Sequence, residues 1–233
     1  MLEKWLQPTG TESARMAKEA GMAENSCKQV DARHYRDEGF SPLRIESVTQ
    51  QLREIAFSGC RSILEIGVGR GMVKHFLHLF PDIQHVGLDL AKDVNPDVVA
   101  SVLDMPFSSG QFELTLCGQV LEHLPFDEFL PALREIRRVT EKRVVLSLPD
   151  IRKHIGMAFR IPGVDDWVRW EFHLDRPDHG KKVFDGQHYW EIGYRGTTGR
   201  SVRNRIREAG FTIDREYRLD RHRWHCFFIL RVR

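Results

Sequence analysis

The 233 residues are enough for one α/β domain with some additional segments, and a hydrophobic content of 41% can build a sizeable core. A net charge of +2 excludes a strongly acidic or strongly basic chain. No apolar run approaches the ~18 residues of a membrane span, and residues 1–21 lack the apolar core and the cleavage site of a signal peptide. These features predict a globular, cytoplasmic protein.

The cysteines are scattered through the chain without a Cys-x-x-Cys pair. Such spacing is not typical of a disulfide framework or of a zinc motif. Cys60 and Cys117 lie beside predicted core strands. We therefore expect the four cysteines to be reduced packing residues: Cys27, Cys60, Cys117 and Cys226.

In chain order, residues 1–40 form a polar N-terminal cap segment, with one short helix from about Glu12 to Ala20. Residues 41–233 form the main domain. Its first helix is expected to start at Ser41, with Pro42 in the first turn. Four apolar residues follow at helical spacing and predict packing against a sheet: Ile45, Val48, Leu52 and Ile55.

The stretch from Ser62 to Gly71, SILEIGVGRG, combines a buried strand, a glycine turn and the start of a helix. Gly67, Gly69 and Gly71 occupy every second position. Glycine is needed where the backbone adopts positive φ or approaches a ligand without a Cβ in the way. The stretch therefore predicts a loop that cradles a nucleotide-type cofactor.

The spacing of these glycines indicates which cofactor. The dinucleotide fingerprint would need a small third residue at Met72, and methionine is too large for close packing of helix on strand. The residues instead resemble the first motif of class I S-adenosylmethionine (SAM)-dependent methyltransferases, an acidic residue two positions before Gly-x-Gly-x-Gly. The motif residues are Glu65, Gly67, Gly69 and Gly71. The alternative is a structural glycine turn.

The next strand, HVGLDL, ends on Asp89 and Leu90. Doubly wound nucleotide-binding folds keep a carboxylate at this place for the ribose hydroxyls. After a loop, the segment VVASVLDMPF predicts a third strand that ends at Asp104. By the same resemblance, Asp104 meets the adenine amino group and Met105 lies beside the ring. The alternative for Asp104 is a turn before Pro106.

The methionine end of the cofactor is assigned by the resemblance as well. Gly118 and Gln119, at the end of a predicted strand over residues 112–118, should face the transferable methyl group. Tyr35 precedes the first strand and would contact the methionine portion, although an ordinary loop residue is an equal alternative. The VLEHL string contains Glu122 and His123, which we interpret as mainly structural.

The remaining pattern alternates strands and helices. A helical stripe of Val73, Phe76, Leu77 and Phe80 follows the glycine loop, and another follows Pro125. Residues 143–150 form a fifth buried strand. A helix ended by Gly210 and two final strands with a short polar connection close the chain. We predict an α/β fold: a doubly wound, mostly parallel seven-stranded sheet with a C-terminal antiparallel β-hairpin, the ending of class I methyltransferases.

Residues 150–196 break this alternation. The segment is rich in tryptophan, phenylalanine and histidine and shows no long strand or helix periodicity. We predict an aromatic, histidine-rich lid insertion that forms a substrate pocket, the alternative being aromatics that only pack the insertion onto the domain. The spacing of its histidines is too irregular for a local zinc motif, and no metal is predicted.

A hydroxyl or protonated amine acceptor needs a base, and a histidine near neutral pH suits this role. The predicted catalytic residues are His188 and Glu191, within DGQHYWEIG, with Asp185 and Glu191 orienting the imidazole. The alternative is a structural His188.

The resemblance implies a SAM-dependent methyltransferase that acts on oxygen or nitrogen of a small-molecule acceptor and yields S-adenosylhomocysteine. Residues 195–233 carry eleven arginines against four acidic residues. They indicate a second hypothesis, an RNA or protein substrate, although an ion-paired surface is the favoured interpretation. A catalytically silent SAM-binding module and, more distantly, an NAD-dependent oxidoreductase remain alternatives. No membrane partner is predicted, and the sequence does not indicate an oligomeric state.

Overall fold

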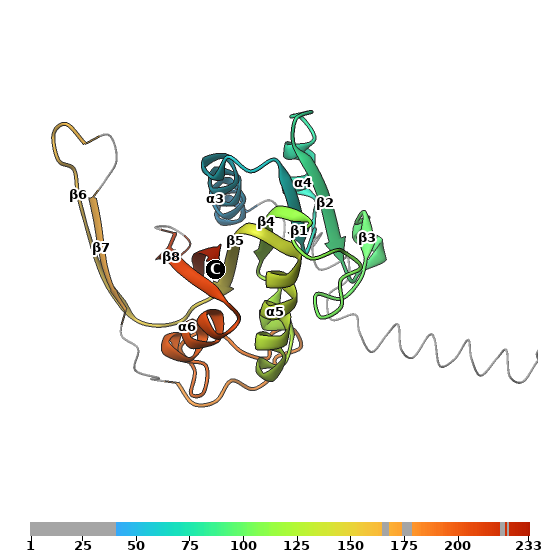
Figure 1. The fold of residues 1–233 in the computed structure, drawn as a ribbon. Coiled ribbons are helices and arrows are strands. Elements are labelled where there is room, and N and C mark those ends of the chain that lie inside the picture. The colour runs from blue at the N-terminus through green and yellow to red at the C-terminus, as the bar shows by residue number, and fades with distance from the viewer. Residues whose placement is uncertain (1–40, 165–167, 174–178, 220–221, 223) are drawn as a thin grey trace, which may run out of the picture.

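The computed structural model describes residues 41–164, 168–173, 179–219, 222 and 224–233. Within them a seven-stranded sheet has the order β3-β2-β1-β4-β5-β9-β8 (Figure 1). Strands β1 to β5 are parallel, and β9 is antiparallel to both of its neighbours. The strands are β1 (Ser62–Ile66), β2 (Gln84–Asp89), β3 (Val98–Val99), β4 (Phe112–Gly118), β5 (Thr140–Pro149), β8 (Phe211–Arg218) and β9 (His225–Val232). The predicted fold class, including the antiparallel C-terminal hairpin, is confirmed.

Helices cover both faces of this sheet. They are α3 (Pro42–Ser58), α4 (Met72–Leu77), α5 (Phe129–Val139) and α6 (Gly199–Glu208), with short 3-10 turns at Lys92–Val94, Leu121–His123 and Phe126–Glu128. Ile63 on β1 packs with the apolar residues of α3 and α4, whereas its neighbour Leu64 packs with those of α5 and α6. The central strands are therefore buried on both sides, as their continuous apolar runs predict.

Two sequence-based expectations fail in the first half of the domain. The third strand was predicted to run as far as Asp104, but β3 holds only two residues and a turn closes with the Asp104 N–H donating to the Ser101 carbonyl at 3.1 Å. The stripe on α4 is also narrower than predicted. Val73 and Leu77 are buried, but Phe76 is 43% exposed, because the helix is only six residues long.

The insertion after β5 contains a β-hairpin, β6 (His154–Phe159) and β7 (Val168–His173), paired in a separate two-stranded sheet. Figure 1 shows this hairpin projecting away from the main body. The expectation that residues 150–196 lack strand periodicity was therefore wrong for this part. The domain boundary at residue 41 and the assignment of the insertion as a lid stay predictions.

Arginines of the C-terminal region form ion pairs within the fold. Arg203 pairs with Glu216, and Arg231 pairs with Asp214. These pairs agree with the favoured, ion-paired interpretation of the C-terminal arginines. Cys60, Cys117 and Cys226 are buried free thiols, and Cys27 lies outside the described residues. No helix within the described ranges is both long enough and apolar enough to cross a membrane.

Candidate active site

A cavity of about 540 Å³ opens at the carboxyl ends of β1, β2 and β4. This volume lies in the usual range for small-molecule sites, and the position is the one at which α/β sheets bind ligands. The N-terminal part of α3, the glycine loop, the ends of β2 and β4, the insertion and the β8–β9 connection contribute to its walls. The pocket thus joins segments that are far apart in sequence.

The glycine loop forms one wall and needs its glycines for the backbone. Gly67, Gly69 and Gly71 have φ values of +82°, +51° and +70°. A Cβ on Gly67 would lie 2.3 Å from Cγ2 of Val120, so a side chain has no room there. Gly67 and Gly69 line the cavity, whereas Gly71 caps the start of α4 and does not. The positive φ values and the close approach of Val120 therefore explain why glycine occupies these positions.

Two carboxylates flank this loop. Asp89, at the end of β2, accepts a hydrogen bond at 2.9 Å from the Ala91 N–H and a longer one, at 3.5 Å, from the Gly69 N–H. Asp89 and Leu90 line the cavity. Glu65 also lines it, but its carboxylate is buried against Nε2 of His85 at 2.9 Å. Burial outweighs this contact and raises the pKa of Glu65. Asp89 is therefore the carboxylate better placed to accept hydrogen bonds from a ligand.

The two residues that were predicted to contact adenine lie outside the cavity. Asp104 is exposed in the turn after Ser101, and Met105 is buried in the core with its N–H donating to Glu135 at 2.8 Å. Neither residue lines the cavity; Ser101 and Val102 do. Asp104 and Met105 lie outside the cavity because the chain turns back after Ser101, before Asp104 is reached. Tyr35 lies outside the described residues.

The end of β4 carries a strained residue. Gln119 has φ of +55°, which is unfavourable for a residue with a side chain. Its N–H donates to the Ser147 carbonyl at 3.0 Å, and Nε2 donates to the Ser147 hydroxyl at 3.2 Å. Oε1 is buried without a hydrogen-bond partner among the described residues. Gly118 and Gln119 both line the cavity, as expected. The amide oxygen is thus a buried acceptor for which the described residues supply no donor.

The insertion supplies a histidine, His188, to the cavity wall and a carboxylate, Glu191, behind it that does not line the cavity. Nδ1 of His188 lies 3.1 Å from Oε1 of Glu191, and the His188 ring stacks on Trp224 with ring centres 5.4 Å apart. Because a carboxylate only accepts, Nδ1 carries the proton and Nε2 is the nitrogen that can take another. The two predicted catalytic residues are therefore in contact, and His188 lines the cavity.

Charge around this pair favours an imidazolium beside a carboxylate. Burial disfavours protonation of His188, but the hydrogen bond to Glu191 and the surrounding carboxylates outweigh it and raise its pKa. Burial likewise opposes ionisation of Glu191, but His188 and Lys182 lower its pKa below the ordinary value. Asp185 instead accepts from the His188 backbone N–H at 2.8 Å and fixes the turn, not the ring.

A second carboxyl, that of Glu122, lies next to His123 and His188. It is fully buried, and neither oxygen has a hydrogen-bond partner among the described side chains and backbone. Burial raises the pKa of Glu122 to about 8. The side chain is therefore protonated and uncharged at neutral pH, which is consistent with the structural role predicted for VLEHL.

Glu122→Gln is expected to make stability less dependent on pH. In the wild type the folded state keeps a proton that the unfolded chain loses above about pH 4.5, so stability falls as pH rises toward 8, by about 1.4 kcal/mol per pH unit. Glutamine does not titrate. Urea unfolding at pH 5 and pH 8.5 should show the variant gaining on the wild type with pH. The exposed Glu141→Gln is the control, and an equal pH response of the two variants would contradict the buried, protonated Glu122.

Among the residues that the structure describes, two groups of side chains lie close enough together to hold a metal ion. In each group the potential ligand atoms lie within 4.8 Å of one another: Glu122, His123 and His188, and Asp185, His188 and Glu191. Lys182 already contacts both carboxylates of the second group, at 2.7 and 2.8 Å. In the first group the carboxyl is the one that retains its proton. The absence of a metal stays a prediction.

The pocket residues that were not predicted from the sequence include three aromatic or histidine side chains near the C-terminus: His222, Trp224 and His225. They lie in and after the connection that was interpreted as a short polar loop. Nδ1 of His225 lies 2.9 Å from the Ser47 hydroxyl of α3, and the His222 and His225 rings are 3.8 Å apart. Burial lowers the pKa of His225 to about 3, so its imidazole is neutral. The RHRWHC string was the available signal, since aromatic residues and histidines are unusual in a solvated turn.

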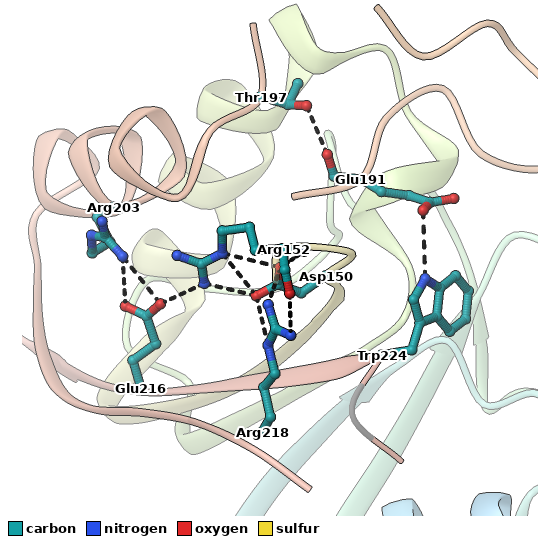
Figure 2. Close-up of polar contacts among 8 residues, drawn as sticks. All are labelled: Asp150, Arg152, Glu191, Thr197, Arg203, Glu216, Arg218 and Trp224. Carbon is teal, nitrogen blue, oxygen red and sulfur yellow. Dashed lines mark hydrogen bonds and ion pairs between the residues drawn. The ribbon is translucent and has the colours of Figure 1, made fainter. Parts of the chain in front are cut away.

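A buried ion-pair network supports this end of the pocket. Asp150, directly after β5, accepts hydrogen bonds from Arg152 and Arg218, and Arg152 also contacts Glu216 at 3.0 Å (Figure 2). The Asp150 N–H donates to the Trp224 carbonyl at 2.8 Å. The two arginines outweigh burial and lower the pKa of Asp150. Asp150 therefore joins the root of the insertion, the end of β8 and the segment carrying Trp224.

Comparison with known proteins gives a match over the five parallel strands of the sheet. Residues 64–148 match the family model described as a methyltransferase domain. An uncharacterized protein of Methanocaldococcus jannaschii is 33% identical over 95 residues, which are 39% of this chain and 41% of the relative. The chain thus spans about two fifths of the length of that relative.

Solved structures match over more of the chain at lower identity. One is the Burkholderia thailandensis 1,6-didemethyltoxoflavin-N1-methyltransferase, which contains 1,6-didemethyltoxoflavin and S-adenosylhomocysteine. It has a TM-score of 0.55 and 15% identity, covering 97% of this chain and 91% of that one. The Synechocystis magnesium protoporphyrin IX methyltransferase has a TM-score of 0.52 and 12% identity, covering 82% and 85%. These likenesses establish the fold.

Proposed function

We propose, from the premise that residues 64–148 form a methyltransferase domain of the class I type, that this chain transfers the methyl group of SAM to an oxygen or nitrogen of a small-molecule acceptor. One observation carries the proposal. One cavity is lined both by the glycine loop with Asp89 and by His188, whose ring contacts Glu191. A cofactor end and an acid–base end in one pocket suit group transfer.

The residues at the cofactor end fit SAM. Gly67, Gly69 and Asp89 line the cavity, and the carboxylate of Asp89 can accept from ribose hydroxyls. The unpartnered oxygen of Gln119 can accept from the ammonium of the methionine portion. When bound, SAM supplies an electrophilic methyl group on a positively charged sulfur.

The residues at the other end can prepare an acceptor. His188, oriented by Glu191, removes a proton from a hydroxyl or ammonium, and Trp224 supplies an apolar wall against which a ring can stack. Holding the acceptor atom in line with the methyl group lowers the barrier by several kcal/mol. Both named structural relatives act on ring-containing small molecules according to their names, which supports the same acceptor class here.

Calorimetric titration with S-adenosylhomocysteine tests the proposal at the cofactor end. The chain is expected to bind it with a dissociation constant on the order of micromolar and not to bind NAD. Asp89→Ala should weaken binding about 10- to 100-fold, because a charged hydrogen-bond acceptor for the ligand is lost. Asp127→Ala, at an exposed carboxylate outside the pocket, is the matched control.

Either of two outcomes would contradict this proposal. Preference for NAD would mean that the glycine loop serves a dinucleotide. An affinity that Asp89→Ala leaves unchanged would mean that the ribose contact is misplaced. If binding behaves as expected, release of S-adenosylhomocysteine in the presence of candidate acceptors identifies the substrate.

A further inference from the structure

The β6–β7 hairpin has one apolar face. Six apolar side chains alternate along its two strands, and each is 42–66% exposed. The register places them opposite one another in three cross-strand pairs: Ile155 with Phe172, Met157 with Trp170, and Phe159 with Val168. Side chains at alternate positions of paired strands share one side of the sheet. The β6–β7 hairpin, which we call the arm, therefore carries a continuous apolar face, which we call the arm face.

Such a face is unlike the scattered apolar residues of an ordinary surface. Six side chains of this size expose roughly 100 Å² each, or about 600 Å² in all, at the upper end of the largest patches on monomers. An isolated two-stranded hairpin is also only marginally stable in water without packing on one face. The arm lies in a sheet of its own and projects from the body (Figure 1). It needs a partner surface.

The charge of the arm favours a second copy of the chain over an anionic membrane as the partner. Residues 153–173 contain three basic and three acidic residues, so the segment has no net charge. An anionic membrane would gain no electrostatic attraction from it, whereas two identical copies would not repel each other. Two arm faces would bury about 1,200 Å² in total, which reaches the range of specific interfaces. A two-fold axis makes the same apolar face complementary to itself.

We infer that the arm face is a dimerisation surface whose occupant is the arm face of a second copy of this chain. Two hairpins then pack face to face as a small two-layer sheet. The Met157–Trp170 pair lies at the centre of each face and is desolvated in the dimer. The inference does not depend on the proposed chemistry, because none of the six residues lines the pocket.

Charge complementation tests this inference on the full chain. One variant carries Met157→Glu and Trp170→Glu, and a second carries Met157→Lys and Trp170→Lys. Each alone should weaken the dimer at least 100-fold, because like charges meet in a desolvated centre. An equimolar mixture of the two variants should restore a dimer, because opposite charges then meet. Sedimentation equilibrium at about 5 to 100 µM measures both effects.

The control is Leu79→Glu, which places the same charge on an apolar residue of the body that is 72% exposed. It should remain dimeric, and circular dichroism should show the same fold for all variants. A monomeric wild type over this concentration range would overturn the inference. So would variants that stay dimeric alone, or a mixture that remains monomeric. Binding of a monomeric wild type to phosphatidylcholine vesicles would assign the arm face to a membrane and would overturn the inference. A chain that dimerises only after deletion of residues 1–40 would assign the arm face to that segment and would equally overturn it.

Discussion

Asp150→Ala is expected to lower the free energy of unfolding by about 3–5 kcal/mol, the largest loss of stability that we predict for a single substitution. The side chains of Asp150, Arg152 and Arg218 are at most 2% exposed, so removing the carboxylate leaves two guanidinium groups buried with reduced compensation. Urea denaturation followed by circular dichroism measures the change. Loss of the carboxylate should also disturb the pocket, because Asp150 holds the segment of Trp224.

Asp214→Ala is the matched control for this substitution. Asp214 lies in the same strand as Arg218, and its partner Arg231 is 58% exposed at the side chain. An exposed pair contributes about 0–1 kcal/mol, so this variant should stay close to the wild type. Equal losses for Asp150→Ala and Asp214→Ala would show that burial of the network does not govern its contribution.

His188→Gln is expected to reduce methyl transfer about 10²- to 10⁴-fold while leaving affinity for S-adenosylhomocysteine within about twofold. Glutamine keeps a polar side chain of similar size but cannot remove a proton. His179→Gln, at an exposed histidine of the same insertion, is the control. A parallel loss of affinity and rate would show that His188 supports the pocket instead of acting on the acceptor.

The pH profile separates a base from a structural histidine. A base acts when neutral, so the rate should rise as pH increases through the pKa of His188, which its carboxylate neighbours raise. Glu191→Gln removes the neighbouring negative charge and should move this rise to lower pH. An unmoved profile would contradict the pairing. Loss of activity in EDTA that Mn²⁺ restores would instead identify His188, His123 and Glu122 as metal ligands.

Most of the fold could be predicted from local sequence patterns. The apolar run of β1, its glycines and the acidic residue at the end of β2 lie within thirty residues of one another, and strand, turn and helix each have a local signal. The sequence therefore predicted that Glu65, Gly67, Gly69 and Asp89 lie close together, and all four line the cavity. Three other residues expected there do not line it: Gly71, Asp104 and Met105. Asp104 was misplaced because the residues after Val99 form a turn, and an apolar run alone does not tell a turn from a continued strand.

Long-range contacts explain the rest. His225 and Trp224 reach the pocket because β9 inserts beside β5 with Pro149 opposite His225, a pairing that nothing in either segment reveals. The arm was missed for a different reason. Its alternation is visible in the sequence, but alternating apolar residues normally predict a strand packed on a core, and here the apolar face is exposed. The pairing of His188 with Glu191 was predictable because the two residues are only three positions apart.

The position of β9 in the sheet determines the order in which parts of the fold can form during synthesis. This strand follows every other strand in sequence, yet it lies between β5 and β8 in the sheet. While a ribosome is still adding residues 225–232, β5 has an open edge and β8 has no neighbour. The parallel strands β1 to β5 can pair early, but the wall formed by Trp224 and His225 exists only after the final strand has been inserted. A nascent chain can therefore hold its glycine loop in place for many seconds before it has a complete pocket.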